Sequence, residues 1–79
     1  METQSLYTQV SDIFKQILNN DNFELQPGDK AGEIDGWDSL THVILIDLIE
    51  RKFDLKFSLG ELEEMKDASD LIETISEKL

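Results

Sequence analysis

The chain has 79 residues, and a domain of this size buries only about 60% of the surface that its unfolded chain exposes, so a deep enzyme pocket is not expected. Eighteen acidic and seven basic side chains give a net charge of −11, which repels nucleic-acid phosphates and anionic lipid headgroups; we expect partners with basic patches. The absence of cysteine excludes a disulfide framework, a thiolate metal site and a protein thiol for acyl transfer.

The same features indicate one soluble domain spanning residues 1–79. The first residues lack the basic region of a secretory signal, and no apolar run approaches the roughly 18 residues that suggest a membrane span. We therefore expect a cytoplasmic monomer that neither inserts into membranes nor binds nucleic acid.

Residues 6–18 are predicted to form an amphipathic helix, because apolar side chains recur at three- and four-residue spacing and polar ones fill the opposite face. The helix should stop near Asn19 and Asn20, since asparagine favours turns and tolerates left-handed backbone at a helix C-terminus. The apolar face consists of Leu6, Val10, Ile13, Phe14, Ile17 and Leu18.

Residues 20–38 form a predicted connection that contains the only proline and three of the four glycines. It is long for a small domain, where most connections run about 4 to 6 residues, and such length indicates either function or disorder. Apolar side chains spaced along it can hold it against the core, so we expect an ordered loop. These anchors are Phe23, Leu25, Ile34 and Trp37.

A second helix is predicted to begin after Asp38, whose carboxylate can accept hydrogen bonds from the first-turn N–H groups and complements the helix dipole. One row of apolar side chains can face the core. Others fall outside this row, and we expect some of their area to form a docking surface; the alternative is that the helix packs on both sides. The first set is Leu45, Leu48, Ile49 and Phe53, and the second is Leu40, Val43, Ile44 and Ile46.

Two more helices follow. Ser58 and Glu61 have capping-box spacing and open a short helix containing Leu62 and Met65. Residues 53–57 alternate like a strand, but a single short strand has no partner and is assigned as loop. The prediction is an all-α fold with three main helices and one short helix. The last helix, capped by Asp67, has the apolar repeat Ala68, Leu71, Ile72, Ile75 and Leu79.

Ser39 and His42 lie three residues apart on one predicted helical face, as a nucleophile and its base would. A serine hydrolase also needs an orienting group and oxyanion donors, and the chain has no Gly-x-Ser-x-Gly elbow and no second histidine. We therefore predict no catalytic residue, and we interpret His42 as packing against Trp37 in a contact like a hydrophobic staple.

Acidic residues around Gly36 raise the alternative of a calcium loop. If Gly36 were the sixth position of an EF-hand loop, the first and twelfth would be Ala31 and His42, which supply no carboxylate. We predict no metal site and interpret the acids as a helix cap and solvated charges, with a weak divalent site as the alternative. The acids are Asp29, Glu33, Asp35 and Asp38.

A further interpretation treats Ser39 as an attachment point. A hydroxyl at a helix N-terminus lies where backbone N–H groups and the helix dipole favour a phosphate. A phosphodiester would be favourable there, and the thiol that the chain lacks would arrive with the modification.

The sequence resembles the acyl carrier protein family, which includes peptidyl carrier proteins, over nearly its whole length. The resemblance is carried by Gly36, Asp38, Ser39 and Leu40, by a following helix that ends in Glu50-Arg51-Lys52-Phe53, and by the two later helices. It implies a four-helix carrier that is modified rather than catalytic. A separate magnesium-dependent phosphopantetheinyl transferase would attach 4'-phosphopantetheine from coenzyme A to Ser39, and the thiol of this arm would hold acyl or aminoacyl groups as thioesters.

The resemblance also implies roles for other positions. Asp38 would assist the transferase and its metal as well as cap the helix. One set of residues would bind partner enzymes, and another would line a cleft for the cargo. The docking set is Leu40, Thr41, Val43, Ile44, Asp47 and Glu50, and the cleft set is Phe57, Leu62, Met65, Ala68 and Leu71.

Three departures from the family pattern narrow the predicted role. Fatty-acid carriers commonly have acids where this chain has Thr41 and Ile44, and because rim charges steer encounter and reject wrong partners, we expect different partner enzymes. Leu62 replaces a small side chain, which favours a short or polar cargo. Asp35 replaces a leucine whose anchoring role Ile34 would take.

We expect a carrier in a specialised biosynthetic pathway rather than central fatty-acid synthesis. The alternatives are an unmodified acidic helical module that binds a basic protein surface, and a carrier fold that has lost modification.

Overall fold

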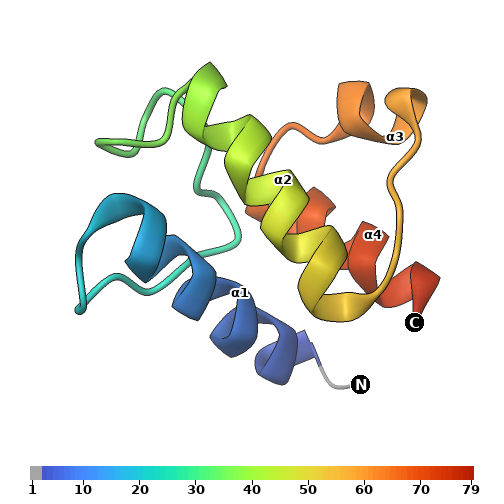
Figure 1. Ribbon diagram of the computed structural model, residues 1–79, viewed down its shortest axis with the longest axis horizontal. Coiled ribbons are helices and arrows are strands. Elements are labelled where there is room, and N and C mark those ends of the chain that lie inside the picture. The colour runs from blue at the N-terminus through green and yellow to red at the C-terminus, as the bar shows by residue number, and fades with distance from the viewer. Residues whose placement is uncertain (1–2) are drawn as a thin grey trace.

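The computed structural model describes residues 3–79 and contains four helices and no strand in that range (Figure 1). The predicted all-α fold is confirmed. Three longer helices surround the core, and the short helix lies in the connection between the second and the last. No helix in the described range is both long and apolar enough to cross a membrane. The helices are α1 (Thr3–Leu18), α2 (Ser39–Phe53), α3 (Leu59–Glu64) and α4 (Ala68–Lys78).

Helix α1 buries the predicted apolar face and stops where the asparagines begin. Asn19 has a φ of 53°, in the left-handed region that asparagine tolerates, so the helix ends at the predicted place. Ile17 and Leu18 are half-buried at the C-terminal end. The buried part of the face consists of Leu6, Val10, Ile13 and Phe14.

The connection from residue 19 to residue 38 is ordered against the core, as predicted. Leu25 and Trp37 are each only 4% exposed. The Trp37 ring meets Phe14 edge-on with ring centroids 4.7 Å apart, a favoured aromatic arrangement. The backbone N–H of Leu25 donates to the hydroxyl of Ser11 at 2.9 Å, which satisfies a buried polar pair.

Helix α2 buries a wider face than the predicted single row. Leu45 and Ile49 are fully buried, as expected. Ile46 lies outside the predicted core row but is only 8% exposed, which fits the alternative that this part of the helix packs on more than one side. Residues 45 and 46 are adjacent, and burying both requires that the core cover a broad arc of the helix. The exposed apolar area is therefore confined to the first half of α2.

Helix α3 is shorter than predicted and has no buried residue. Ser58 and Glu61 form the predicted capping box, in which each side chain accepts the other residue's backbone N–H. Met65 was placed inside this helix, but it is the C-cap with an extended backbone, so the helix ends one residue earlier.

Helix α4 begins after Asp67, whose side chain accepts from the backbone N–H of Asp70 at 3.0 Å, and this cap was predicted. Two N–H groups at its start donate to the long loop, from Ala68 to the carbonyl of Asp29 and from Ser69 to the carbonyl of Pro27. Leu71, Ile72 and Ile75 are buried with Ala68. Leu79 was predicted to continue the apolar repeat, but it follows the helix and is 51% exposed.

Candidate modification site

The start of α2 presents Ser39 on a helix end that side chains fix in place. Asp38 is the N-cap, and its Oδ1 accepts from the backbone N–H groups of Leu40 and Thr41 at 3.0 Å each. The hydroxyl of Thr41 in turn accepts from the backbone N–H of Asp38 at 2.9 Å. This is a complete capping box, and it leaves Ser39 as the first residue of the helix.

Thr41 has a structural role that the sequence analysis missed. Its hydroxyl donates to the carbonyl of Gly36 at 2.7 Å, so one side chain holds both the cap and the turn before it. A threonine three residues after an aspartate could have predicted the reciprocal bond, because either side chain of a capping box can accept a backbone N–H. Thr41, predicted for docking, is half-buried with its hydroxyl engaged.

Ser39 is exposed, and no hydrogen bond within residues 3–79 occupies its hydroxyl. By contrast, Asp38 already takes two of the N–H groups of the first turn, so these are not free to bind a phosphate as we had expected. The hydrogen bond from the Thr41 backbone holds the pKa of Asp38 below its ordinary value, which keeps the carboxylate ionised at neutral pH. An exposed hydroxyl without an internal partner, on a rigid helix end, fits the attachment of a phosphodiester.

His42 is bound to Trp37 rather than to Ser39. The indole Nε1–H donates to His42 Nδ1 at 3.1 Å, and the two rings are near parallel with an interplanar angle of 26°. The predicted apolar staple is therefore a polar contact. Burial lowers the pKa of His42, which favours the neutral ring. No hydrogen bond joins His42 to Ser39 in the described chain, so the geometry of a serine nucleophile and its base is not formed.

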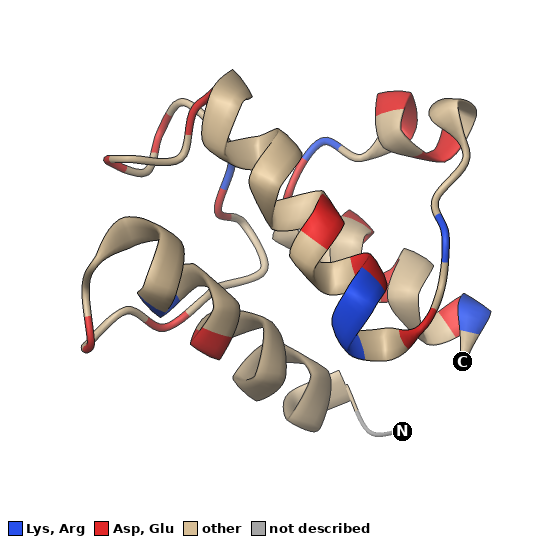
Figure 2. Ribbon diagram, in the orientation of Figure 1, with Lys and Arg blue, Asp and Glu red and all other residues tan. Residues whose placement is uncertain are grey.

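Three neighbouring apolar side chains on α2 are exposed to solvent. Leu40 is 72% exposed, Val43 68% and Ile44 48%, and we call these three residues the α2 apolar patch. Figure 2 shows that the first turns of α2 carry no charged residue, whereas acidic and then basic residues follow towards its C-terminal end. Asp47, also predicted for docking, is exposed and pairs with Arg51 at 3.0 Å.

Glu50, the last of the predicted docking residues, is half-buried. Its Oε2 accepts the backbone N–H of Phe57 at 2.8 Å. This bond ties the connection after α2 back to the helix, a role that the sequence did not reveal because the partners are seven residues apart and are brought together by a loop.

The predicted cleft residues do not all share one cavity. Ala68 and Leu71 are buried, whereas Phe57, Leu62 and Met65 are half-buried. A cavity of about 80 Å³ contains only Met65 and Leu71 of this set, together with residues that were not predicted to line a cleft. Its full lining is Ala31, Trp37, His42, Met65, Lys66, Asp67 and Leu71.

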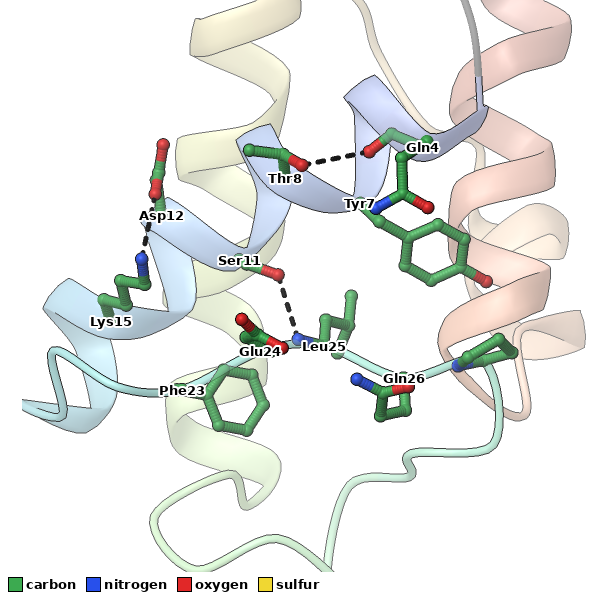
Figure 3. Close-up of a pocket in the computed structure, with 11 residues that line it drawn as sticks. Gln4, Tyr7, Thr8, Ser11, Asp12, Lys15, Phe23, Glu24, Leu25 and Gln26 are labelled. Carbon is green, nitrogen blue, oxygen red and sulfur yellow. Dashed lines mark hydrogen bonds and ion pairs between the residues drawn. The ribbon is translucent and has the colours of Figure 1, made fainter.

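A more voluminous groove lies elsewhere, between α1 and residues 23–27 (Figure 3). It measures about 430 Å³, and both polar and apolar side chains line it. Its walls include the hydrogen bond from Leu25 to Ser11 and the ion pair between Lys15 and Asp12. None of the predicted site residues lines it. This groove is therefore separate from the modification site.

Two of the four loop acids hold the backbone through their side chains. Asp29 accepts the backbone N–H of Gln26 at 2.8 Å, and Asp38 caps α2. Within residues 3–79, there is no group of three or more Asp, Glu, His or Cys side chains that could hold a metal ion.

Comparison with solved structures identifies the family. The chain is similar to the solution structure of the holo acyl carrier protein from Geobacter metallireducens, at 36% sequence identity. The likeness covers 92% of this chain and 84% of that chain, with a TM-score of 0.85. The chain belongs to the acyl carrier protein family. No protein-family model matches it, and no curated protein sequence matches it.

Membership confirms the family that the Gly36, Asp38, Ser39 and Leu40 pattern predicted. It also supports a carrier role for this acyl carrier protein. The helix arrangement seen in Figure 1 is that of the family.

Proposed function

We propose that this protein carries acyl or aminoacyl groups as thioesters on 4'-phosphopantetheine attached to Ser39. The observation that carries the proposal is the exposed hydroxyl of Ser39, which has no hydrogen bond in residues 3–79 and stands at a helix end fixed by Asp38 and Thr41. The similar protein from Geobacter metallireducens was solved in its holo form, which supports the same modification here. When bound, the group supplies the thiol that this cysteine-free chain lacks.

Each residue of the site has a defined task under this proposal. Ser39 supplies the acceptor hydroxyl. Asp38 and Thr41 hold the helix start rigid, so that a transferase meets Ser39 in one geometry rather than in many, which reduces the entropic cost of binding. The second oxygen of Asp38 makes no hydrogen bond in the described chain, so it remains available to the transferase and its magnesium ion.

The α2 apolar patch is the proposed contact for the phosphopantetheinyl transferase and for the enzymes that load and unload the cargo. Apolar side chains exposed at 48–72% and lying next to Ser39 favour a partner with a complementary apolar surface. The net charge of −11 steers basic docking patches towards the chain, and Asp47 adds an exposed acid. Thr41 and Glu50 act by shaping this surface, since their side chains are engaged internally.

The composition of the patch favours a specialised biosynthetic pathway over central fatty-acid synthesis. Ile44 stands where fatty-acid carriers commonly have an acid, so the patch offers apolar contact there instead of charge. Thr41, at the other such position, also lacks the charge, and its hydroxyl is bonded to the carbonyl of Gly36. Partners that recognise acids at these positions would lose those contacts, whereas partners with apolar surfaces would gain them.

The net charge of −11 and the exposed Asp47 of α2 favour a second candidate, an unmodified acidic module that binds a basic protein surface through α2. Intact mass separates the two. We would incubate the chain with coenzyme A, magnesium and a broad-specificity phosphopantetheinyl transferase, and then measure the wild type and Ser39→Ala. The carrier predicts one phosphopantetheine increment for the wild type and none for the variant.

Ser58→Ala is the matched control. Ser58 and Leu59 repeat the Ser-Leu pair at a helix start, but the hydroxyl of Ser58 is engaged by the backbone N–H of Glu61 at 3.2 Å. This variant should gain the full increment. A wild type without the increment, or a Ser39→Ala variant with it, would contradict the proposed function.

A further inference from the structure

One row of side chains runs along the exposed face of α2, from the turn that holds Ser39 to the end of the helix. Its members are three or four residues apart, so they lie on the same side of α2, and all of them are exposed. We propose that Arg51, the last member, binds a carboxylate on the docking surface of the phosphopantetheinyl transferase. This inference rests on the proposed function and describes the partner that modifies Ser39. The row consists of Leu40, Ile44, Asp47 and Arg51.

The charge along α2 changes from one end to the other (Figure 2). Residues 39–46 contain no acid, lysine or arginine, whereas residues 51–56 contain three of the seven basic side chains of the chain and only one acid. The two acids between these segments are engaged, Asp47 by Arg51 and Glu50 by the backbone N–H of Phe57. This end of α2 is therefore locally positive on a chain with a net charge of −11, and it complements an acidic group of a partner.

The guanidinium group of Arg51 has room for a second partner. Its Nε lies 3.0 Å from Oδ2 of Asp47, and its two Nη groups have no partner within residues 3–79. The Nη groups can donate in parallel to both oxygens of a carboxylate, an arrangement that is stronger and more specific than a single bond. The side chain of Arg51 is 77% exposed, and a surface pair of this kind contributes little to stability. Asp47 therefore orients Arg51 without removing it from contact with a partner.

The transferase is the partner that this row fits. It acts on the hydroxyl of Ser39 itself, and twelve helical residues at 1.5 Å each place Arg51 about 18 Å from Ser39 along the axis of α2. A contact at a fixed distance from the reacting atom orients the enzyme on its substrate. The enzymes that load and unload the cargo act at the end of a flexible arm, so this contact would not fix their geometry. The net charge attracts basic surfaces from a distance, whereas the carboxylate at Arg51 determines the orientation in the complex.

The test measures kcat and KM for the whole chain with coenzyme A, magnesium and the phosphopantetheinyl transferase purified from the cells that make this protein. Arg51→Glu should raise KM by at least about tenfold, because a hydrogen bond to a charged group is lost and two acids are brought together. The kcat should stay near the wild-type value, since a contact this far from Ser39 is the same in the ground state and the transition state. Arg51→Lys keeps the charge but loses the paired donors, so it should raise KM by a smaller factor.

Lys52→Glu is the matched control. It makes the same change of charge at the next residue, and both glutamate variants place an acid in the last turn of α2, where the helix dipole disfavours it. Lys52 is exposed but lies about 100° around the helix from Arg51, outside the row. Its KM should stay within about twofold of the wild-type value. Urea unfolding shows whether both variants are folded, and if Arg51→Glu is not, the KM of Arg51→Lys decides.

An unchanged or lower KM for the Arg51 variants would overturn the inference, and a lower KM for Arg51→Glu would indicate a basic group of the transferase at that point. An equal rise for Arg51→Glu and Lys52→Glu would overturn it as well, because it would be a general effect of charge. In each case the wild type still gains phosphopantetheine, so the proposed function stands. A wild type that the transferase does not modify would contradict the proposed function together with this inference.

Discussion

Trp37 Nε1 donates to His42 Nδ1 at 3.1 Å, and this bond joins the last buried residue of the long loop to the first half of α2. Trp37 also packs on Phe14 of α1, so the bond connects the helix that bears Ser39 to the core. It requires a neutral His42, because a protonated ring has no acceptor nitrogen.

This requirement predicts a pH dependence of stability. Burial lowers the pKa of His42 in the folded chain below its ordinary value of 6.5, so the unfolded chain binds this proton more readily. The stabilisation from neutral His42 is then complete above pH 6.5 and is lost as the pH falls through the lower pKa of the folded chain. Lys66 and Asp67 also line the cavity beside this ring. An NMR titration should place the pKa of His42 below 6.5.

His42→Phe isolates this effect, because it keeps an aromatic ring but does not titrate. Falling pH also reduces the repulsion among the acidic residues, which affects both proteins alike. Urea unfolding from about pH 8 to about pH 5 should show the wild type losing stability relative to the variant. A parallel pH dependence of the two proteins would contradict the role of the Trp37 bond.

Asp38 caps α2 and has the proposed second task of assisting the transferase, and two substitutions separate these tasks. Asp38→Asn keeps a side-chain oxygen that can cap α2 but removes the charge, so its melting temperature should stay close to that of the wild type. Asp38→Ala removes the cap and should lower the melting temperature by on the order of 5 °C. Both should slow phosphopantetheine transfer if the carboxylate assists the transferase and its magnesium ion. An Asn variant modified at the wild-type rate would limit Asp38 to capping.

Alanine substitutions at the three glycines of the long loop should change the stability of the fold by different amounts. Gly36 has a φ of +89°, and a Cβ there would lie 3.0 Å from Leu18 Cδ2, so Gly36→Ala should reduce the free energy of unfolding by about 1–3 kcal/mol. Gly32 has the same φ but open space around it, so Gly32→Ala should reduce the free energy of unfolding only by the backbone cost of the left-handed conformation, about 1 kcal/mol. Gly28 has neither constraint, so Gly28→Ala should be neutral or stabilising by up to about 1 kcal/mol. Urea unfolding measures all three, and equal effects would contradict the geometry of the loop.

The α2 apolar patch should affect recognition without affecting stability. Val43→Ala should change the free energy of unfolding by no more than about 0.5 kcal/mol, whereas Leu45→Ala, in the core, should cost about 2–5 kcal/mol. Val43→Glu should lower kcat/KM of the transferase by about tenfold, the effect of losing one important interface contact. Leu59→Glu is the control, because Leu59 is 73% exposed on α3 outside the patch. An equal loss for both glutamate variants would indicate a general charge effect.

The sequence predicted those parts of the fold that depend on local patterns. The caps at Asp38, Ser58 and Asp67 use side chains within a few residues of the N–H groups that they accept, so spacing alone reveals them. The stop at Asn19 has the same local origin. The burial of Ile46 could not be predicted this way, because it depends on how broadly the rest of the core covers α2.

At the candidate site, the sequence predicted the arrangement of Asp38 and Ser39 but not the contacts of the residues around them. Ser39 and Asp38 are adjacent in the sequence, and their pattern predicted the cap of α2, which is observed, whereas the modification of Ser39 stays a prediction. The Glu50 bond to Phe57 and the cavity beside His42 depend on loops that bring distant residues together, and no spacing rule reports them. The polar contact between Trp37 and His42 was predicted as packing, because proximity of two rings does not reveal the direction of an N–H bond.

The most direct test of the central claim is fragment mass spectrometry of the chain after transferase treatment, which locates the modified residue. We expect a single phosphopantetheine on Ser39, in wild type and in Ser58→Ala alike. A phosphopantetheine group on any other residue, or an unmodified Ser39 under conditions that fully modify a known carrier, would contradict it.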